Sequence, residues 1–330
     1  MAERILPQVA ASLAIALLAT WGALALWMRL PFGAVGNGVG AALWTGLMVL
    51  ACWLSWQRSV WQGLAVTAAG FAGLMLWWAS LLPSNDRIWQ PDMARVAAAD
   101  VAGDMLTVRN VRHFRWQAGV PPVERWETRR YRLSELQGAD LFLSYWSGEL
   151  VAHAIVSFTF ADSDPLAFSI EIRREKGEQF SSLDGFFKSY ELAIIAADER
   201  DVVKVRSTVR GEDVRLYRLD MQRATARALL LEYVSLANDV SANPRWYHTL
   251  TANCTTVIFG MARRLDPGIR PDWRILLPGK LPSYLQEQDF LRRDVPLEEL
   301  VRRGKIGARA QGPYPDSGFS KRIRDGVPMP

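Results

Sequence analysis

The sequence contains few residues that bind metals or act as nucleophiles, with 2 cysteines and 3 histidines in 330 residues. Cys52 lies in a long uncharged run, so Cys254 is the one cysteine of the charged part of the chain. A lone cysteine excludes an internal disulfide scaffold and a zinc site built on several cysteines. The histidines have no metal-ligand spacing with Cys254, and no glycine-rich phosphate loop follows a predicted strand. We therefore expect no metal and no cofactor.

Charge is nearly absent from the first 85 residues. Between Arg4 and Asp86 the charged residues are Arg29 and Arg58, which separate three uncharged runs. Each run exceeds the ~20 residues that cross a hydrocarbon core as a helix. A cleaved signal peptide would explain the first run but not the other two. The sequence therefore predicts three transmembrane helices, at residues 6–28, 38–56 and 61–82.

Tryptophan and arginine support a multi-pass membrane anchor and indicate its orientation. Six tryptophans lie near the predicted helix ends, where an indole ring prefers the headgroup level: Trp27, Trp53, Trp56, Trp61, Trp77 and Trp78. Arg4 and Arg58 would lie on one side of the membrane and Arg29 on the other. The positive-inside rule then places the N-terminus inside and the C-terminal domain outside, with a margin of one arginine.

The chain from Asp86 onward is charged and has mixed periodicities, and its length suits one substantial domain. Residues 291–330 hold nine Lys/Arg against five Asp/Glu, a surplus of four. Such a tail could contact anionic lipid or be solvated. No basic motif interleaved with aromatic residues suggests nucleic acid. We predict an anchor over 1–83, a domain over 84–290 and a basic tail over 291–330.

Strand patterns precede helix patterns in this domain, which predicts an α+β fold. Alternating apolar residues predict strands over 104–118, 140–148, 190–199, 201–210 and 213–220. Residues 149–175 are predicted to form two strands joined by a turn at Ala161–Pro165. Helical spacing of apolar residues predicts helices over 221–239 and from about Cys254 to a stop at Pro267–Gly268.

Cys254 is predicted to lie in the first turn of a helix. Thr251 or Asn253 is a natural N-cap, and the positive end of the helix dipole would lower the pKa of a thiol there. First-turn N–H groups, assisted by the Asn253 side chain, could stabilise an oxyanion. We assign Asn253 and Thr255 to this oxyanion site or to positioning the thiol. The alternative is an inert buried cysteine.

His153 is the candidate base. It shares the polar face of its strand with Ser157 and Thr159, and a turn centred near Asp162 would pair it with Glu171 on the next strand. A carboxylate there would fix the imidazole tautomer and support its protonated form. Glu175 would take this place if the register slipped by one pair. The alternative is a solvated polar face with an incidental histidine.

Several stretches resemble the Lnb N-terminal periplasmic domain family, named after a bacterial lyso-form lipoprotein N-acyltransferase. The main ones are "DLFLSYWSGELVAHAIVSFTF" (140–160), "SIEIRREKGEQFSSLDGFFKSYELAIIAADERDV" (169–202) and "WYHTLTANCTT" (246–256), with shorter matches from residue 84 onward. The resemblance implies an acyl-transfer site in which Cys254 is the nucleophile and His153 the base, with Glu171 as orienting residue. It departs at His113, where asparagine is expected, so His113 is not assigned to the mechanism.

The order of histidine on a strand, a polar residue on the next strand and cysteine at a helix start also resembles permuted papain-like enzymes, including NlpC/P60-type hydrolases. We therefore expect an α+β, permuted papain-like domain behind three transmembrane helices. The expected function is a periplasmic thiol acyltransferase of the bacterial inner membrane that acts on lipids or lipoproteins. The alternatives are a cysteine peptidase or amidase on envelope peptides, and a catalytically silent, membrane-anchored binding module.

Overall fold

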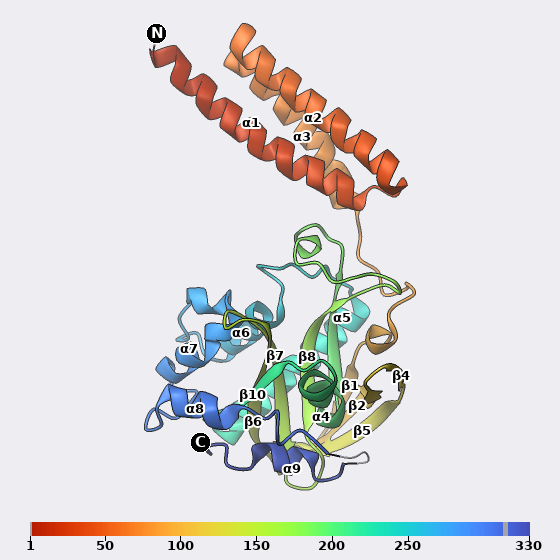
Figure 1. Ribbon diagram of the computed structural model, residues 1–330, viewed down its shortest axis with the longest axis vertical. Coiled ribbons are helices and arrows are strands. Elements are labelled where there is room, and N and C mark those ends of the chain that lie inside the picture. Colours follow the sequence, from red (N-terminus) through yellow and green to blue (C-terminus); the bar gives the residue numbers. More distant parts are fainter. Residues whose placement is uncertain (1, 313–315) are drawn as a thin grey trace. The chain divides into compact units, whose positions relative to one another are not determined.

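Figure 1 shows the computed structural model, which describes residues 2–312 and 316–330. The described residues form two compact units. The first contains the chain up to Ser84 together with Phe180–Tyr190. The second contains Asn85–Gln179 and the described residues from Glu191 onward. Each unit is considered separately below, and the domain boundaries proposed from the sequence stay predictions.

The first unit begins with three long helices, α1 (Ala2–Arg29), α2 (Gly33–Gln57) and α3 (Val60–Ser80). Within the described residues these are the helices long and apolar enough to cross a membrane. The sequence predicted α2 to begin at residue 38, but the glycine-rich segment from Gly33 is already helical. Glycine is tolerated in apolar helices because neighbouring helices pack closely against it. Here Trp44 of α2 packs against Gly22 and donates a hydrogen bond to Ala19 O at 3.1 Å.

The segment Phe180–Tyr190 packs on these helices. Phe187 is buried, with ring centroids 6.3 Å from Trp21 and 6.5 Å from Trp78. Lys188 Nζ donates a hydrogen bond to Trp78 O at 2.7 Å, near the C-terminal end of α3. A cation is favourable there because the last carbonyl groups of a helix lack partners within it. This segment is therefore held by both aromatic packing and a helix-end contact.

The second unit is built on a mostly antiparallel sheet. Among the described residues it has eight strands: β1 (Ala98–Ala102), β2 (Met105–Arg112), β5 (Trp126–Arg132), β6 (Leu136–Ser147), β7 (Val151–Phe160), β8 (Leu166–Arg173), β9 (Glu191–Ala197) and β10 (Asp213–Arg218). The order is β1-β2-β9-β8-β7-β6-β10, and β5 pairs with β2. A separate hairpin comprises β3 (Arg115–Gln117) and β4 (Val120–Val123). The structure confirms a mixed α+β fold.

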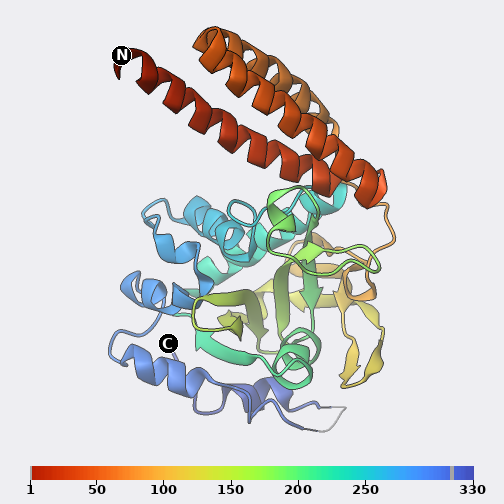
Figure 2. The same ribbon diagram turned by 45° about the horizontal axis from the view of Figure 1, so that its top comes forward.

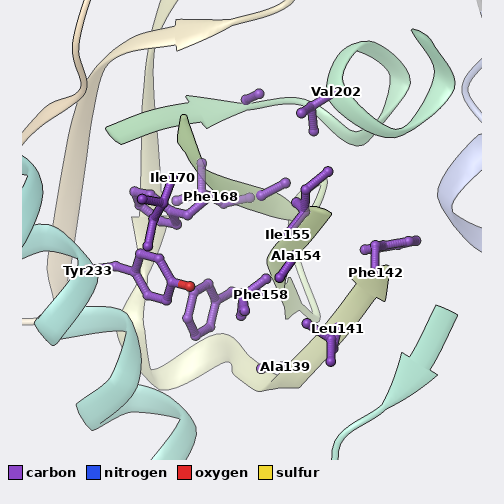
Figure 3. Packing of buried hydrophobic residues seen from close by; sticks show 14 of the residues in the cluster. Ala139, Leu141, Phe142, Ala154, Ile155, Phe158, Phe168, Ile170, Val202 and Tyr233 are labelled. Atoms are coloured by element: carbon purple, nitrogen blue, oxygen red, sulfur yellow. The ribbon is translucent and has the colours of Figure 1, made fainter. Parts of the chain in front are cut away.

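Helices cover the sheet because its central strands are apolar on one face and mixed on the other. Figure 3 shows Phe158 and Phe168 directed toward Tyr233 of α5 (Arg223–Ala242), with centroids 5.8 Å and 5.1 Å from its ring. Ile155 lies on the opposite face of β7 from Phe158 and points toward Val202 of α4 (Glu199–Lys204). The central strands are therefore buried on both faces, as expected where helices pack on each side of a sheet.

The remaining helices follow α5 in the chain: α6 (Cys254–Leu265), α7 (Leu281–Glu287), α8 (Leu297–Gly304) and α9 (Phe319–Arg324). Figure 2 shows the last three in blue beside the sheet. Arg324 of α9 bonds Asp140 of β6 at 2.8 Å and forms a bidentate ion pair with the buried Glu199. Nearby, Arg322 pairs with Asp316. Much of the positive charge of 291–330 is thus satisfied within the domain, and lipid contact by this segment stays a prediction.

One predicted strand, over 201–210, is wrong. These residues form the end of α4 and a π-helix at Val205–Val209. Asp198 caps α4 by accepting a hydrogen bond from Arg200 N at 2.8 Å. Asp201 is fully buried, and its carboxylate accepts hydrogen bonds from the Arg112 guanidinium and Phe114 N. These tertiary contacts fix a helix where the alternating valines alone favour a strand.

Candidate functional site

Cys254 is the first residue of α6, as the sequence predicts. The N-cap is Asn253, whose Oδ1 accepts hydrogen bonds from Thr255 N at 3.0 Å and Thr256 N at 2.9 Å. The Thr256 hydroxyl in turn accepts a hydrogen bond from Asn253 N at 3.0 Å, which completes a capping box. Of the two N-cap candidates, the structure selects Asn253 and not Thr251.

His153 lies near the start of β7, beside the end of β8. The pairs between these strands run from Ile155–Ser169 to Phe158–Leu166. This is the register that a turn centred near Asp162 predicts. His153 Nε2 accordingly lies 3.1 Å from Glu171 Oε1.

Cys254 meets β7 where its ladder with β8 has ended. The Cys254 thiol lies beside the His153 side chain and the Ala154 backbone N–H, which both lower its pKa. The Nε2 atom of His153 lies against Ser169 and Glu171 on β8. Where the β7–β8 ladder has ended, Cys254 thus has both a backbone donor, Ala154 N–H, and a side-chain partner, His153.

The pKa values of the two groups move in opposite directions. Burial raises the pKa of the Cys254 thiol, but the hydrogen bond and positive charge of His153 outweigh burial and leave this pKa below its ordinary value. Burial lowers the pKa of His153, but the Glu171 charge and the contact with Cys254 raise it to about 9. Both shifts favour the charged forms, a thiolate beside an imidazolium, and the thiolate is the nucleophilic form of a cysteine.

Glu171 and Ser169 hold the far side of the imidazole. His153 Nε2 lies 2.7 Å from Ser169 Oγ, and Ser169 Oγ donates a hydrogen bond to Glu171 Oε1 at 2.6 Å. Burial raises the pKa of Glu171, but the charges of His153 and Arg206 hold it well below the ordinary value. The carboxylate is therefore ionised, and it fixes the imidazole through a direct contact and through the serine hydroxyl.

Arg206 is a site residue that the sequence did not reveal. It lies in the π-helix and is buried, and its Nη2 donates to Glu171 Oε1 at 2.8 Å. Its other amino group lies 3.5 Å from Glu212, which in turn accepts a hydrogen bond from Ser144. Ser144 is the cross-strand neighbour of His153 on β6. This network neutralises a carboxylate that would otherwise be costly to bury.

The side chains of Asn253 and Thr255 make hydrogen bonds around the first turn of α6. Asn253 Nδ2 donates to Thr249 O at 2.6 Å, and its Oδ1 is the cap acceptor. The Thr255 hydroxyl donates to Ile275 O at 2.6 Å. One N–H of the Asn253 amide is thus engaged, and its assistance to an oxyanion stays a prediction. Because the N–H groups of Thr255 and Thr256 serve the cap, the first-turn donor suited to an oxyanion is the backbone N–H of Cys254.

The other candidates lie outside this cluster. Glu175, the alternative acid, pairs with Arg87 at 2.6 Å. His113 Nδ1 lies 3.2 Å from Glu127, and His248 Nδ1 accepts a hydrogen bond from Leu250 N at 3.3 Å. Among the described residues, no group of three or more His, Cys, Asp or Glu side chains is placed to hold a metal ion.

These features define a class of protein in which three apolar helices precede an α+β domain that brings cysteine, histidine and glutamate side chains together. Residues 123–279 match the family described as the Lnb N-terminal periplasmic domain, which confirms the resemblance noted from the sequence. The matched range contains His153, Glu171, Arg206 and Cys254. No curated protein and no solved structure matches the chain. Family and helices together fit a membrane-anchored protein with a periplasmic domain.

Proposed function

We propose that this chain is a membrane-anchored periplasmic thiol acyltransferase that acts on lipids or lipoproteins. The observation that carries the proposal is the placement of His153 beside the capped, first-turn Cys254, with Glu171 3.1 Å behind the imidazole. A buried cysteine without a chemical role does not require a charged partner, and because burying three ionisable groups together is costly, such a cluster is a candidate functional site.

The first half-reaction forms a thioester. The Cys254 thiolate attacks the carbonyl carbon of an ester in the donor, a carbon–sulfur bond forms, and the carbonyl electrons move to oxygen. The backbone N–H of Cys254 stabilises this oxyanion. When the intermediate collapses, the ester carbon–oxygen bond breaks and the leaving oxygen takes the proton from the His153 imidazolium. The product is an acyl-enzyme beside a neutral imidazole.

The second half-reaction regenerates the Cys254 thiolate. An amine of the acceptor attacks the thioester while His153 accepts its proton, and the carbon–sulfur bond breaks to give an amide and a thiolate. The family resemblance favours an amine of a lipoprotein as acceptor. Water in the same place would make the enzyme a hydrolase, the function of the peptidase or amidase alternative.

The order of the site residues along the chain supports a permuted papain-like arrangement. His153 on β7 comes first, Glu171 on β8 follows, and Cys254 opens a helix later in the chain. We assign the three helices to the bacterial inner membrane and the domain to the periplasm. This orientation agrees with the arginine distribution and with the family that residues 123–279 match.

The test is the intact mass of the detergent-purified protein after incubation with a diacylated lipopeptide, beside Cys254→Ala and His153→Ala. The proposal predicts a hydroxylamine-sensitive acyl adduct on the wild-type protein and none on Cys254→Ala. The adduct should be discharged by an added lipopeptide amine faster than by buffer. Discharge by water alone would indicate a hydrolase. An unacylated wild-type protein whose Cys254 reacts equally with iodoacetamide with or without His153 would favour the binding module.

A further inference from the structure

Exposed apolar side chains occur on three segments around the N-terminal end of α6. One segment is the end of β6 with the turn into β7, another is the turn at 248–252, and the third is residues 273–277. Their large apolar side chains are each 46% to 61% exposed: Trp146, Leu150, Leu250, Trp273 and Leu276. We call these five residues the apolar rim. Exposed apolar residues that gather at one place usually mark a binding surface.

Hydrogen bonds attach two of these segments directly to the cap of α6. The Thr255 hydroxyl donates to Ile275 O at 2.6 Å, which holds Trp273 and Leu276 next to the first turn of the helix. Asn253 Nδ2 donates to Thr249 O at 2.6 Å, the residue before Leu250.

The turn between β6 and β7 joins the same region from the histidine side. Gly279 N donates to Leu150 O at 3.0 Å, so the segment that carries Trp273 and Leu276 also contacts the turn that leads into His153. A methyl group on Gly279 would lie 2.3 Å from Glu149 O, so this approach requires glycine. The rim therefore borders both the nucleophile and its base.

The interior side of Cys254 is packed with buried side chains. Its neighbour Ala154 is fully buried, and the ring of Tyr233 is fully buried against Phe168, with centroids 5.1 Å apart. Tyr233 lies on α5, which contacts α6. We therefore expect a group bonded to Sγ to leave toward the surface, where the rim lies.

The charges on the rim segments are paired, so the rim does not present a free ionic site. Glu149 forms a bidentate ion pair with Arg215 at 2.6 Å and 2.9 Å. Arg274 bonds Asp272 at 2.8 Å and also pairs with Glu287. A polar peptide would gain little from this surface, whereas a hydrocarbon chain would remove it from water, which is favourable in proportion to the apolar area buried.

We propose that the apolar rim binds the hydrocarbon chain of the acyl donor and selects long chains over short ones. This inference rests on the proposed thioester at Cys254. It assigns Trp273 and Leu276 to chain binding, in addition to the groups that perform the chemistry.

The test compares acylation of the full-length protein by p-nitrophenyl laurate and p-nitrophenyl acetate, followed by nitrophenol release and intact mass. Wild type should prefer laurate, and Trp273→Gln and Leu276→Gln should each lower the laurate-to-acetate ratio of kcat/KM by about tenfold, because a few methylenes in an apolar site are worth that much. Val123→Gln is the matched control, since Val123 is exposed but lies in the separate β3–β4 hairpin. Its ratio should equal that of wild type.

The outcomes separate the two proposals. Acylation of Cys254 by both esters with no preference for laurate, or an unchanged ratio in both rim variants, would overturn the assignment of the rim while the acyl-enzyme chemistry stands. No acylation of wild type by either ester would overturn both. Acylation of the rim variants by acetate shows that their sites remain intact, so loss of the laurate preference cannot be attributed to misfolding.

Discussion

The His153–Cys254 pair shows at the residue scale how burial and charge compete. Burial alone would leave a neutral thiol and a neutral imidazole, because a low-dielectric surrounding disfavours both charged forms. The ionised Glu171 reverses this result for His153, and the resulting imidazolium reverses it for Cys254. The negative charge of Cys254 therefore depends on Glu171 through the imidazole of His153. Because Glu171 by itself disfavours the thiolate, the His153 imidazole is essential.

Alkylation by iodoacetamide should follow a thiol pKa below the ordinary value for cysteine, because His153 lowers the pKa of Cys254. In His153→Ala this pKa should rise above the ordinary value, since burial, the largest effect, and the Glu171 charge are then opposed only by the Ala154 backbone N–H. The measurement is the alkylation rate against pH, on a Cys52→Ser background so that only Cys254 reacts. Equal pKa values with and without His153 would contradict the ion pair.

The charge of Glu171 should set the upper limit of the active pH range. Because His153 must be protonated to donate to the leaving group, acylation of the wild type should fall as the pH rises through about 9. In Glu171→Gln the support for the imidazolium is lost, and both burial and Arg206 lower the pKa of His153, so this fall should occur at lower pH. The measurement is the pH profile of acylation by the diacylated lipopeptide, because the alkoxide that leaves from an alkyl ester needs a proton.

Glu175→Gln is the matched control for that experiment, since Glu175 pairs with Arg87 and not with His153. The acylation rate of Glu175→Gln should fall at the same pH as that of the wild type. If the acylation rate of Glu171→Gln also fell at the wild-type pH, the Glu171 carboxylate would have no influence on the proton of His153 and only a packing role.

The elements that carry these residues are stabilised by hydrogen bonds between residues close in sequence. The N-cap of α6 is the clearest example. In Asn253→Ala the N–H groups of Thr255 and Thr256 lose their acceptor, so the free energy of unfolding should fall by ~1–2 kcal/mol. Thr251→Ala should have little effect, because Thr251 is not the cap. Thermal unfolding of the detergent-solubilised variants measures both, and equal stabilities would show that the cap is dispensable.

The sequence was sufficient for those elements whose geometry is local. The register of β7 and β8 followed from alternation about a turn, because side chains repeat every two residues along a strand. The start of α6 followed from the N-cap preference of asparagine. Arg206 had no such signal: its segment alternates like a strand, and its contact with Glu171 spans 35 residues of chain. Contacts made through tertiary packing leave no periodicity in the sequence, so this part of the site could not be predicted.

At the scale of the whole molecule, the first unit also combines helices that the sequence predicts with tertiary packing that it does not. Three uncharged runs identify α1, α2 and α3 because a membrane-spanning helix is defined by its own length and apolarity. The packing of Phe180–Tyr190 on these helices depends on residues about a hundred positions away, such as Trp78, which contacts Lys188 of the segment. A linear division of the sequence assigns this segment to the sheet domain, because β8 and β9 flank it.

Phe187 should determine whether this segment stays packed on the helices. Its ring is buried between Trp21 and Trp78, so Phe187→Ala removes a contact worth ~3–5 kcal/mol in a protein core. Hydrogen exchange of residues 180–190 in the full-length protein in lipid nanodiscs should then accelerate by about two orders of magnitude. Phe180→Ala should leave exchange unchanged, because the Phe180 side chain is exposed. Exchange that is as slow in Phe187→Ala as in wild type would mean that the Lys188 contact with α3 is sufficient to hold the segment.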